Sequence, residues 1–220
     1  SAGLAIIMPD EVALFVDGRY TLQARQQVPL DQVKVIHSGE ISPFSYLESR
    51  LPNNAIVAYD PWLHTAYEKQ QWLRKTSRLS WQFTGLDKNP VDQLWLDRPQ
   101  RPLHPVFLLD HQFTGKSSQA KIEDVRAALV NAGADLTYIG APDALCWLLN
   151  IRGSDFPYTP LVDAMAFLDR GGYVTLVIDP VKVPEEVQRS FEGGVKIIPE
   201  TGLLAFLKNQ KDRKILAHVS

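Results

Sequence analysis

Val12-Ala13-Leu14-Phe15-Val16-Asp17-Gly18-Arg19-Tyr20 is the stretch that decides the fold. Five apolar residues, the length of a strand, end at an aspartate and a glycine, and a helical pattern begins at Thr21. A second stretch of this kind, Val174-Thr175-Leu176-Val177-Ile178-Asp179, lies 162 residues further on. The two stretches are the first sign that the chain contains the same structural unit twice.

The repeat extends beyond these strands. At an offset of 162, seven of the 25 positions from 12 to 36 are identical to their partners. In the first copy these are Val12, Leu14, Asp17, Gln26, Val33, Lys34 and Ile36. Phe44 meets Phe206 at the same offset, and Ile56 meets Ile215 after a shortening by three residues. Both halves share the order hairpin, helix, strand, helix, strand, so the sequence predicts a tandem repeat of two α/β domains, each a mixed β-sheet flanked by helices.

The apolar patterns give the expected bounds of the elements. In the first half, strands are predicted at 4–8, 12–16, 33–37, 55–59 and 79–83, and helices at 21–28, 43–51 and 65–76. In the second half, strands are predicted at 136–139, 164–168, 173–178, 195–198 and 215–219, and helices at 119–132, 144–149, 185–191 and 203–209. The second copy therefore has a helix, a strand and a helix before its hairpin. If the copies are alike, roughly 50 residues precede Ser1 in the parent protein.

A proline-rich segment separates the two halves. It carries Pro90, Pro99, Pro102 and Pro105, which favour an extended, stiff connector, and residues 91–96 have the pattern of one helical turn. We therefore expect a first domain at 1–90, a linker at 91–105 and a second domain at 106–220.

Composition excludes several classes of partner. The formal net charge is −2 and no run of Lys and Arg forms a tract, so the sequence favours neither nucleic acid nor an anionic membrane. No apolar stretch approaches the roughly 20 residues that span a bilayer. The single cysteine, Cys146, rules out an internal disulfide, which is typical of a reducing compartment and predicts a cytoplasmic protein.

Motifs for chemistry are not found in this sequence. None of the five histidines has the His-Glu-x-x-His spacing of a metal site, and no serine lies in Gly-x-Ser-x-Gly. Cys146 lies on an apolar helical face, which favours a buried structural thiol over a nucleophile. Gly171-Gly172 and Gly193-Gly194 are not placed at strand-to-helix turns, which argues against nucleotide binding. We expect no catalytic residue and no metal ligand set in this chain.

Four segments, in the right order, resemble the three-domain Xaa-Pro aminopeptidases (aminopeptidase P). Ser1-Ala2-Gly3 resembles the end of the family's Thr-Gly-Ser-Ala-Gly stretch, and residues 17–20 resemble its Asp-Gly-Arg-Tyr motif. Asn89-Pro90-Val91-Asp92 with its following prolines resembles the family's interdomain connector. Residues 147–155, Trp-Leu-Leu-Asn-Ile-Arg-Gly-Ser-Asp, resemble a signature of its second domain.

This resemblance implies the first two, creatinase-like domains of a metallo-exopeptidase. Such an enzyme releases the N-terminal residue from peptides with proline at the second position. Its third domain holds two divalent metals, usually manganese, with two Asp, one His and two Glu. We therefore expect no cofactor in this chain, a missing catalytic domain as its partner, and a homodimer in the full-length enzyme.

The resemblance implies that Arg19 binds substrate. A guanidinium can hold a peptide carbonyl or carboxylate in fixed geometry through its fork of N–H donors. The alternative is that Arg19 braces its own turn against Asp17. Asp17, Asn150 and Arg152 are candidates for a loop or interdomain role. For Arg152, pinning the following loop to the neighbouring domain is favoured over substrate contact. The five tryptophans are expected in cores or interdomain packing.

Two other functions stay open on the sequence. The runner-up is a stand-alone peptide- or protein-binding module, because creatinase-like domains also occur in relatives without peptidase activity. A third interpretation is a purely structural oligomerisation domain.

Overall fold

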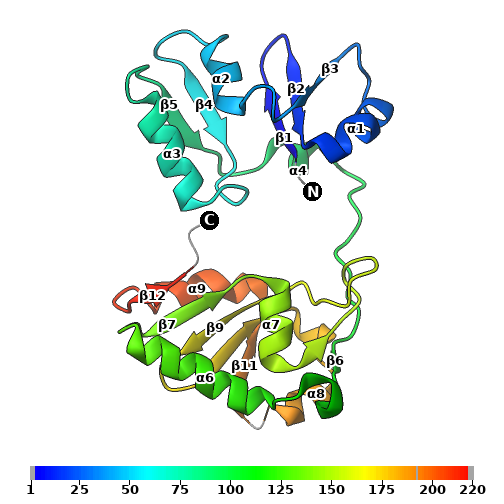
Figure 1. Cartoon of the computed structure of the whole chain (residues 1–220), viewed down its shortest axis with the longest axis vertical. Helices are drawn as coiled ribbons and strands as arrows, with labels where there is room; N and C mark the ends of the chain where they lie inside the picture. The colour runs from blue at the N-terminus through cyan, green and yellow to red at the C-terminus, as the bar shows by residue number, and fades with distance from the viewer. Residues whose placement is uncertain (1–2, 192, 218–220) are drawn as a thin grey trace. The chain divides into compact units, whose positions relative to one another are not determined.

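The computed structural model describes residues 3–191 and 193–217 (Figure 1). Positions 1 and 2 of the opening motif and the last residues of the predicted strand 215–219 lie outside the described residues. The chain divides into two compact units between Leu96 and Asp97, within the proline-rich segment. Each unit is described by itself.

Unit 1 contains two small sheets and four α-helices. Its elements are β1 (Gly3–Ile7), β2 (Val12–Val16), η1 (Gly18–Tyr20), α1 (Thr21–Gln27), β3 (Val33–His37), α2 (Pro43–Glu48), β4 (Ile56–Tyr59), α3 (Ala66–Thr76), β5 (Gln82–Gly85) and α4 (Pro90–Leu94). β1 and β2 form an antiparallel hairpin, and β3 pairs parallel to β2. β4 and β5 form a separate parallel pair beside this sheet (Figure 1).

Short polar residues cap α2, α3 and α4 of unit 1, and one core holds both sheets. The Ser42 hydroxyl caps α2 directly before Pro43, and Thr65 with Glu68 forms a capping box on α3. The core joins Ile6, Ala13 and Phe15 of the hairpin to Phe44, Tyr46 and Leu47 of α2 and to Trp81. Val57 of β4 and Phe83 of β5 pack against the same cluster, so the two sheets share a core on one face.

Unit 2 is built around one five-stranded mixed sheet. Its elements are β6 (Phe107–Leu108), α5 (His111–Thr114), α6 (Ser118–Asn131), β7 (Leu136–Ile139), α7 (Pro142–Leu149), β8 (Ile151–Arg152), β9 (Met165–Asp169), β10 (Val174–Val177), η2 (Pro180–Lys182), α8 (Glu185–Ser190), β11 (Val195–Ile198), η3 (Glu200–Gly202), α9 (Leu203–Lys208) and β12 (Ile215–Leu216). The strand order is β11-β10-β9-β7-β12. The short strands β6 and β8 pair antiparallel outside this sheet.

The two units share one strand pairing and one register. In unit 1 the hairpin strand β2 pairs parallel with β3, with Val12 opposite Val33. In unit 2 the hairpin strand β10 pairs parallel with β11, with Val174 opposite Val195. Both partners of the second pair lie 162 residues after those of the first. A mixed α/β fold was predicted, and the structure is one.

Three predictions of local structure differ from what is observed. The strand expected at 79–83 begins at Gln82, because Ser80 has φ of +54°, a left-handed conformation that interrupts an extended backbone. The pair β6–β8 and helix α5 were not predicted, since two-residue strands and a one-turn helix carry little sequence periodicity. Trp62 was expected in a core or an interdomain contact; the core alternative is wrong, since Trp62 is 76% exposed and lies outside the core of its unit.

Unit 2 contains a buried ion pair. The Lys182 ammonium donates to Asp155 Oδ2 at 2.5 Å, and the Asp163 amide donates to the same oxygen at 2.8 Å. The two side chains are 5% and 2% exposed. Removing one member of such a pair leaves an uncompensated charge in the interior.

We therefore expect Lys182→Met to lower the free energy of unfolding of unit 2 by about 3–5 kcal/mol. Lys116→Met is the matched control, because Lys116 pairs with Asp124 at the surface, where such pairs contribute about 0–1 kcal/mol. Urea unfolding of both variants measures the difference, and equal small losses would contradict the prediction.

A second charged network fixes the hairpin of unit 1. Glu11, in the β1–β2 turn, accepts hydrogen bonds from Lys34, from the buried Tyr46 hydroxyl and, at 3.0 Å, from Arg50 Nε. The Arg50 guanidinium also lies over the Tyr46 ring, 3.6 Å from its centre. These contacts, above all the hydrogen bond from Lys34, lower the pKa of Glu11 from 4.5 to about 2.

This shift predicts an acid-dependent loss of stability in unit 1. Because the pKa is lowered in the folded state, the stabilisation is complete above pH 4.5 and is lost as the pH falls through about 2. Glu11→Gln should lower the protection of the β2 amides at neutral pH, and its difference from wild type should shrink between pH 4.5 and 2. Hydrogen exchange corrected for intrinsic rates measures this, with the exposed Glu40→Gln as control. A difference that does not change with pH would contradict it.

Candidate functional site

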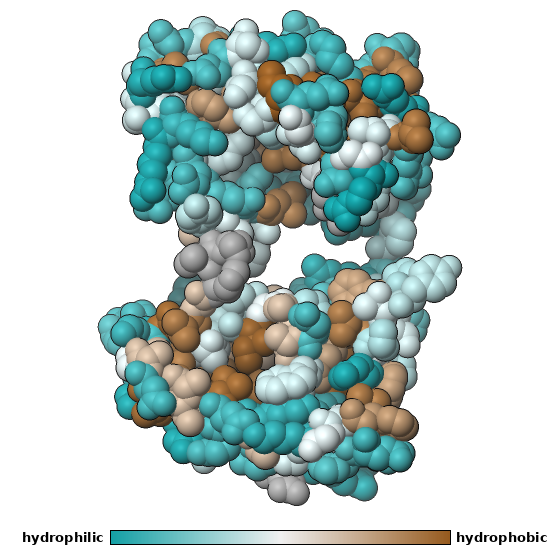
Figure 2. All heavy atoms as spheres, in the orientation of Figure 1, coloured by the Kyte–Doolittle hydropathy of each residue, from teal (hydrophilic) through white to brown (hydrophobic). Residues whose placement is uncertain are grey.

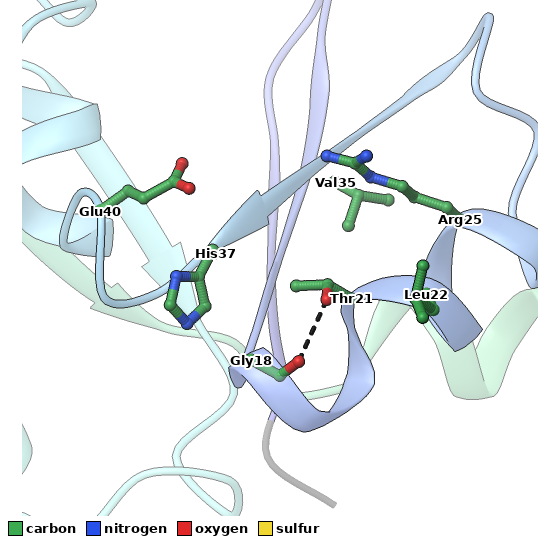
Figure 3. Close-up of a pocket in the computed structure, with 7 residues that line it drawn as sticks. All are labelled: Gly18, Thr21, Leu22, Arg25, Val35, His37 and Glu40. Atoms are coloured by element: carbon green, nitrogen blue, oxygen red, sulfur yellow. Dashed lines mark hydrogen bonds between the residues drawn. The ribbon is translucent and has the colours of Figure 1, made fainter.

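The candidate site lies where β2 and β3 end. Because these strands are parallel, their carboxyl ends meet at one edge of the sheet, where ligands bind in many α/β folds. A pocket of about 370 Å³ opens there (Figure 3). It is lined by Gly18, Thr21, Leu22, Arg25, Val35, His37 and Glu40.

Arg19 stands beside this pocket on the turn that follows β2. Asp17 Oδ1 accepts the Arg19 backbone amide at 3.0 Å, which caps η1, and Arg19 Nε at 2.8 Å. The hydrogen bond from the Arg19 side chain holds the pKa of Asp17 below its usual range and raises the pKa of Arg19. The Arg19 side chain is still 75% exposed. The bracing contact expected as the alternative is therefore present, and it leaves most of the guanidinium open to solvent.

Two glycines allow the His37 ring to lie between the two turns. A Cβ at Gly18 would stand 3.0 Å from His37 Nε2, and a Cβ at Gly39 would stand 2.9 Å from His37 Cε1. A larger residue at either position would push the ring away. Glycine in the Asp-Gly-Arg-Tyr stretch thus keeps His37 at the pocket wall, between the end of β2 and the turn after β3 (Figure 3).

The pocket presents groups of both charges. Arg25 reaches over Val35 from α1, and Glu40 extends from the turn after β3 on the far side of His37 (Figure 3). The Thr21 hydroxyl is occupied, since it donates to the Gly18 carbonyl at 3.0 Å. Separated donors and acceptors of this kind suit the main chain and ends of a peptide. The arrangement favours binding and orientation over covalent chemistry.

Asn150 and Arg152 lie in unit 2 and hold one end of α7. Asn150 has φ of +53° as the C-cap of α7; it accepts from Lys121 Nζ at 2.6 Å and donates to the Lys116 carbonyl at 2.9 Å. Arg152 Nη1 donates to the Cys146 and Ile151 carbonyls at 3.0 and 2.8 Å. Both side chains stabilise the helix end within their own unit.

Cys146 lies in the core of unit 2. It is 1% exposed, its Sγ accepts a hydrogen bond from the Val162 amide at 3.4 Å, and burial raises the pKa of its thiol. A thiol held neutral in this way is a poor nucleophile, as the sequence predicted.

The sequence did not point to Thr21, Arg25, His37 and Glu40. Thr21, His37 and Glu40 lie within a few residues of the carboxyl end of β2 or β3, and Arg25 lies on α1, which connects the two strands. The feature that could have pointed to these residues is the parallel pairing of β2 and β3, which brings the ends of the two strands together. The repeat in the sequence indicates two related units but does not show which side chains meet at those ends.

The second copy has a different site at the same place. A cleft of about 240 Å³ lies at the carboxyl ends of β10 and β11, and Asp179 caps η2 as Asp17 caps η1. The counterpart of Arg19 at the 162-residue offset is Val181. The segment Arg101-Pro102-Leu103 lines this cleft, and Arg101 pairs there with Glu200. An arginine at this turn is thus a property of the first copy.

The residues present do not fit a metal pair. Across 3–191 and 193–217, no three His, Cys, Asp or Glu side chains gather where they could hold a metal ion. We therefore derive no metal-dependent step for this chain. Over the same ranges, no helix is long and apolar enough to cross a membrane.

The match to known families defines the class of this protein. Residues 97–220 match the model of the creatinase/prolidase N-terminal domain. The chain belongs to this family.

The particular relatives are aminopeptidases. The chain is 34% identical to Aminopeptidase P1 of Arabidopsis thaliana and 32% identical to a probable Xaa-Pro aminopeptidase P of Leptosphaeria maculans, over 93% and 96% of its own length. It covers 32% and 37% of those proteins. The crystal structure of the X-prolyl aminopeptidase of Caenorhabditis elegans, described as a cytosolic enzyme with a di-nuclear active site, matches with a TM-score of 0.89 at 28% identity. That match covers 96% of this chain and 35% of the C. elegans chain, so this chain spans about a third of its relatives.

Proposed function

We propose that this chain is the non-catalytic N-terminal region of a Xaa-Pro aminopeptidase, a hydrolase that releases the first residue of peptides with proline second. The observation that carries the proposal is the combination of two features. One is similarity along almost the whole chain to aminopeptidases about three times as long. The other is the exposed Arg19 beside a charged pocket.

In this proposal unit 1 supplies part of the peptide-binding site. Arg19 is oriented by Asp17 and stays accessible, so it can donate to a peptide carbonyl or carboxylate with little reorganisation. Arg25 and Glu40 offer further partners of opposite charge within the pocket. Asn150 and Arg152 take no part in substrate contact; they set the end of α7 and the loop that follows it.

In this proposal the catalytic groups belong to other parts of the parent enzyme. We propose that a catalytic domain outside this chain holds two divalent metals, manganese by preference, and that the parent is a cytoplasmic homodimer. The di-nuclear site and cytosolic location of the C. elegans enzyme support the metals and the compartment.

The 220-residue chain should therefore not hydrolyse Arg-Pro-Pro, with or without added manganese, because the described residues offer no ligand set for a metal pair. Release of arginine measured by amine labelling tests this, with the parent enzyme as the positive control. Metal-dependent release of arginine above a protein-free blank would contradict the proposal that the catalytic site lies outside this chain.

In the parent enzyme, Arg19→Ala should lower kcat/KM by roughly ten- to hundred-fold, the effect of losing one charged hydrogen bond to substrate. Arg19→Lys should restore little, because an ammonium cannot reproduce a two-pronged contact. Metal content and melting temperature should stay close to wild type.

The matched control is Arg189→Ala, since Arg189 is also an exposed arginine paired with a carboxylate, Glu185, but lies in unit 2. It should leave kcat/KM unchanged. A normal rate with a lowered melting temperature in Arg19→Ala would assign Arg19 to turn bracing alone and overturn its role in binding.

A further inference from the structure

The buried ion pair of unit 2 has one oxygen without a partner. Charged side chains mostly lie at the surface of each unit, where hydrophilic residues are abundant (Figure 2). Asp155 and Lys182 are exceptions, with side chains 2% and 5% exposed. Asp155 Oδ2 accepts from the Lys182 ammonium and from the Asp163 amide, but Oδ1 has no hydrogen-bond donor among the described residues. A buried carboxylate oxygen in this state costs free energy, which a nearby donor could recover.

A histidine of the linker lies opposite this oxygen. His104 Nδ1 is 4.0 Å from Asp155 Oδ1, too far for a hydrogen bond but close enough for opposite charges to attract. The His104 side chain is 56% exposed, so it can change its rotamer at little cost in packing. A movement of about 1 Å would bring its ring nitrogen within hydrogen-bonding distance of Oδ1.

His104 belongs to a segment, residues 101–106, that is already held on unit 2 near both of its ends. Arg101 pairs with a glutamate of η3 at the cleft where β10 and β11 end. The buried Val106 donates its amide to the Lys182 carbonyl at 2.8 Å. A hydrogen bond from His104 would therefore add an attachment between these two contacts.

We propose that His104 is a pH-dependent attachment point of the linker. When the imidazole is protonated, its Nδ1–H donates to Asp155 Oδ1 and fixes residues 101–106 on unit 2. When the proton leaves to solvent, the ring loses its charge and, in the Nε2–H tautomer, its donor at Nδ1. The segment is then held by Arg101 and Val106 alone, and a longer part of the linker is not attached to unit 2.

The groups around the imidazole determine the sign of the pH dependence. Asp155 is the carboxylate that faces the ring, and Lys182 lies on the other side of that carboxylate, bound to Oδ2. The cleft beside the segment also carries Arg101, Asp163, Asp179 and Glu200. Histidine is the side chain that changes charge between pH 5 and 8. Because the hydrogen bond favours the protonated ring, the attachment is present at the acidic end of this range and is lost as the pH rises.

Hydrogen exchange of the 220-residue chain at about pH 5.5 and about pH 8 tests the proposal. After correction for intrinsic rates, we expect the Leu103 and Val106 amides to exchange about three- to tenfold faster in His104→Gln than in wild type at the lower pH. At the higher pH the two chains should exchange alike. Amides of β9 and β10 should not change, because His104 is a surface residue outside the sheet.

The matched control is His111→Gln, which changes an exposed histidine of α5 in the same unit. It should leave the exchange of Leu103 and Val106 as in wild type at both pH values. The proposal is overturned if His104→Gln changes neither amide, or if it accelerates them by the same factor at both pH values.

His104→Lys gives a second test, because an ammonium keeps its charge throughout this pH range. We expect the Val106 amide of this variant to be better protected than that of His104→Gln at both pH values, with no dependence on pH. If His104→Lys exchanges as fast as His104→Gln at both, a cation at this position does not hold the segment. If it keeps the pH dependence of wild type, another group titrates. Either result would show the proposal to be wrong.

Discussion

The parallel pairing between the second hairpin strand and the strand that follows the helix is the constraint on which both units depend. A hairpin can be built from neighbouring residues, but a parallel pair needs a crossover, here η1 with α1 and η2 with α8. The crossover begins where the strand ends, so an aspartate at that point caps the first turn in both copies. The strand topology therefore determines where the site lies, whichever residues line it.

The two copies use the same place differently. At the first turn Arg19 projects into solvent, and at the second Val181 takes its position while the segment 101–103 lines the cleft. The helices that follow differ in the same way. Arg25 of α1 lines the pocket, whereas its counterpart Val187 of α8 is fully buried. The first copy has an accessible polar edge at this place, whereas in the second copy residues of the linker line the cleft.

The sequence predicted what local patterns and the repeat determine. The strands 12–16, 33–37 and 136–139 have the predicted bounds because each is a short segment rich in apolar and β-branched residues between residues that favour turns. The contact of Arg19 with Asp17 was considered on the sequence as the alternative to substrate binding, and it is present. Arg25, His37 and Glu40 were not singled out, since their meeting depends on the parallel pairing in space. The interruption at Ser80 depends on a backbone angle that no residue pattern specifies there.

Binding and bracing by Arg19 are compatible because Asp17 makes two contacts with it. Glu11 with Lys34 secures the amino end of the β2–β3 pair, and Asp17 secures the carboxyl end. If the guanidinium leaves Asp17 for a ligand, the carboxylate still accepts the Arg19 backbone amide at 3.0 Å, so η1 keeps its cap. The side-chain contact is exposed, and exposed ion pairs contribute little to stability. The stability of the turn thus does not depend on the position of the Arg19 guanidinium, which is free to contact a ligand.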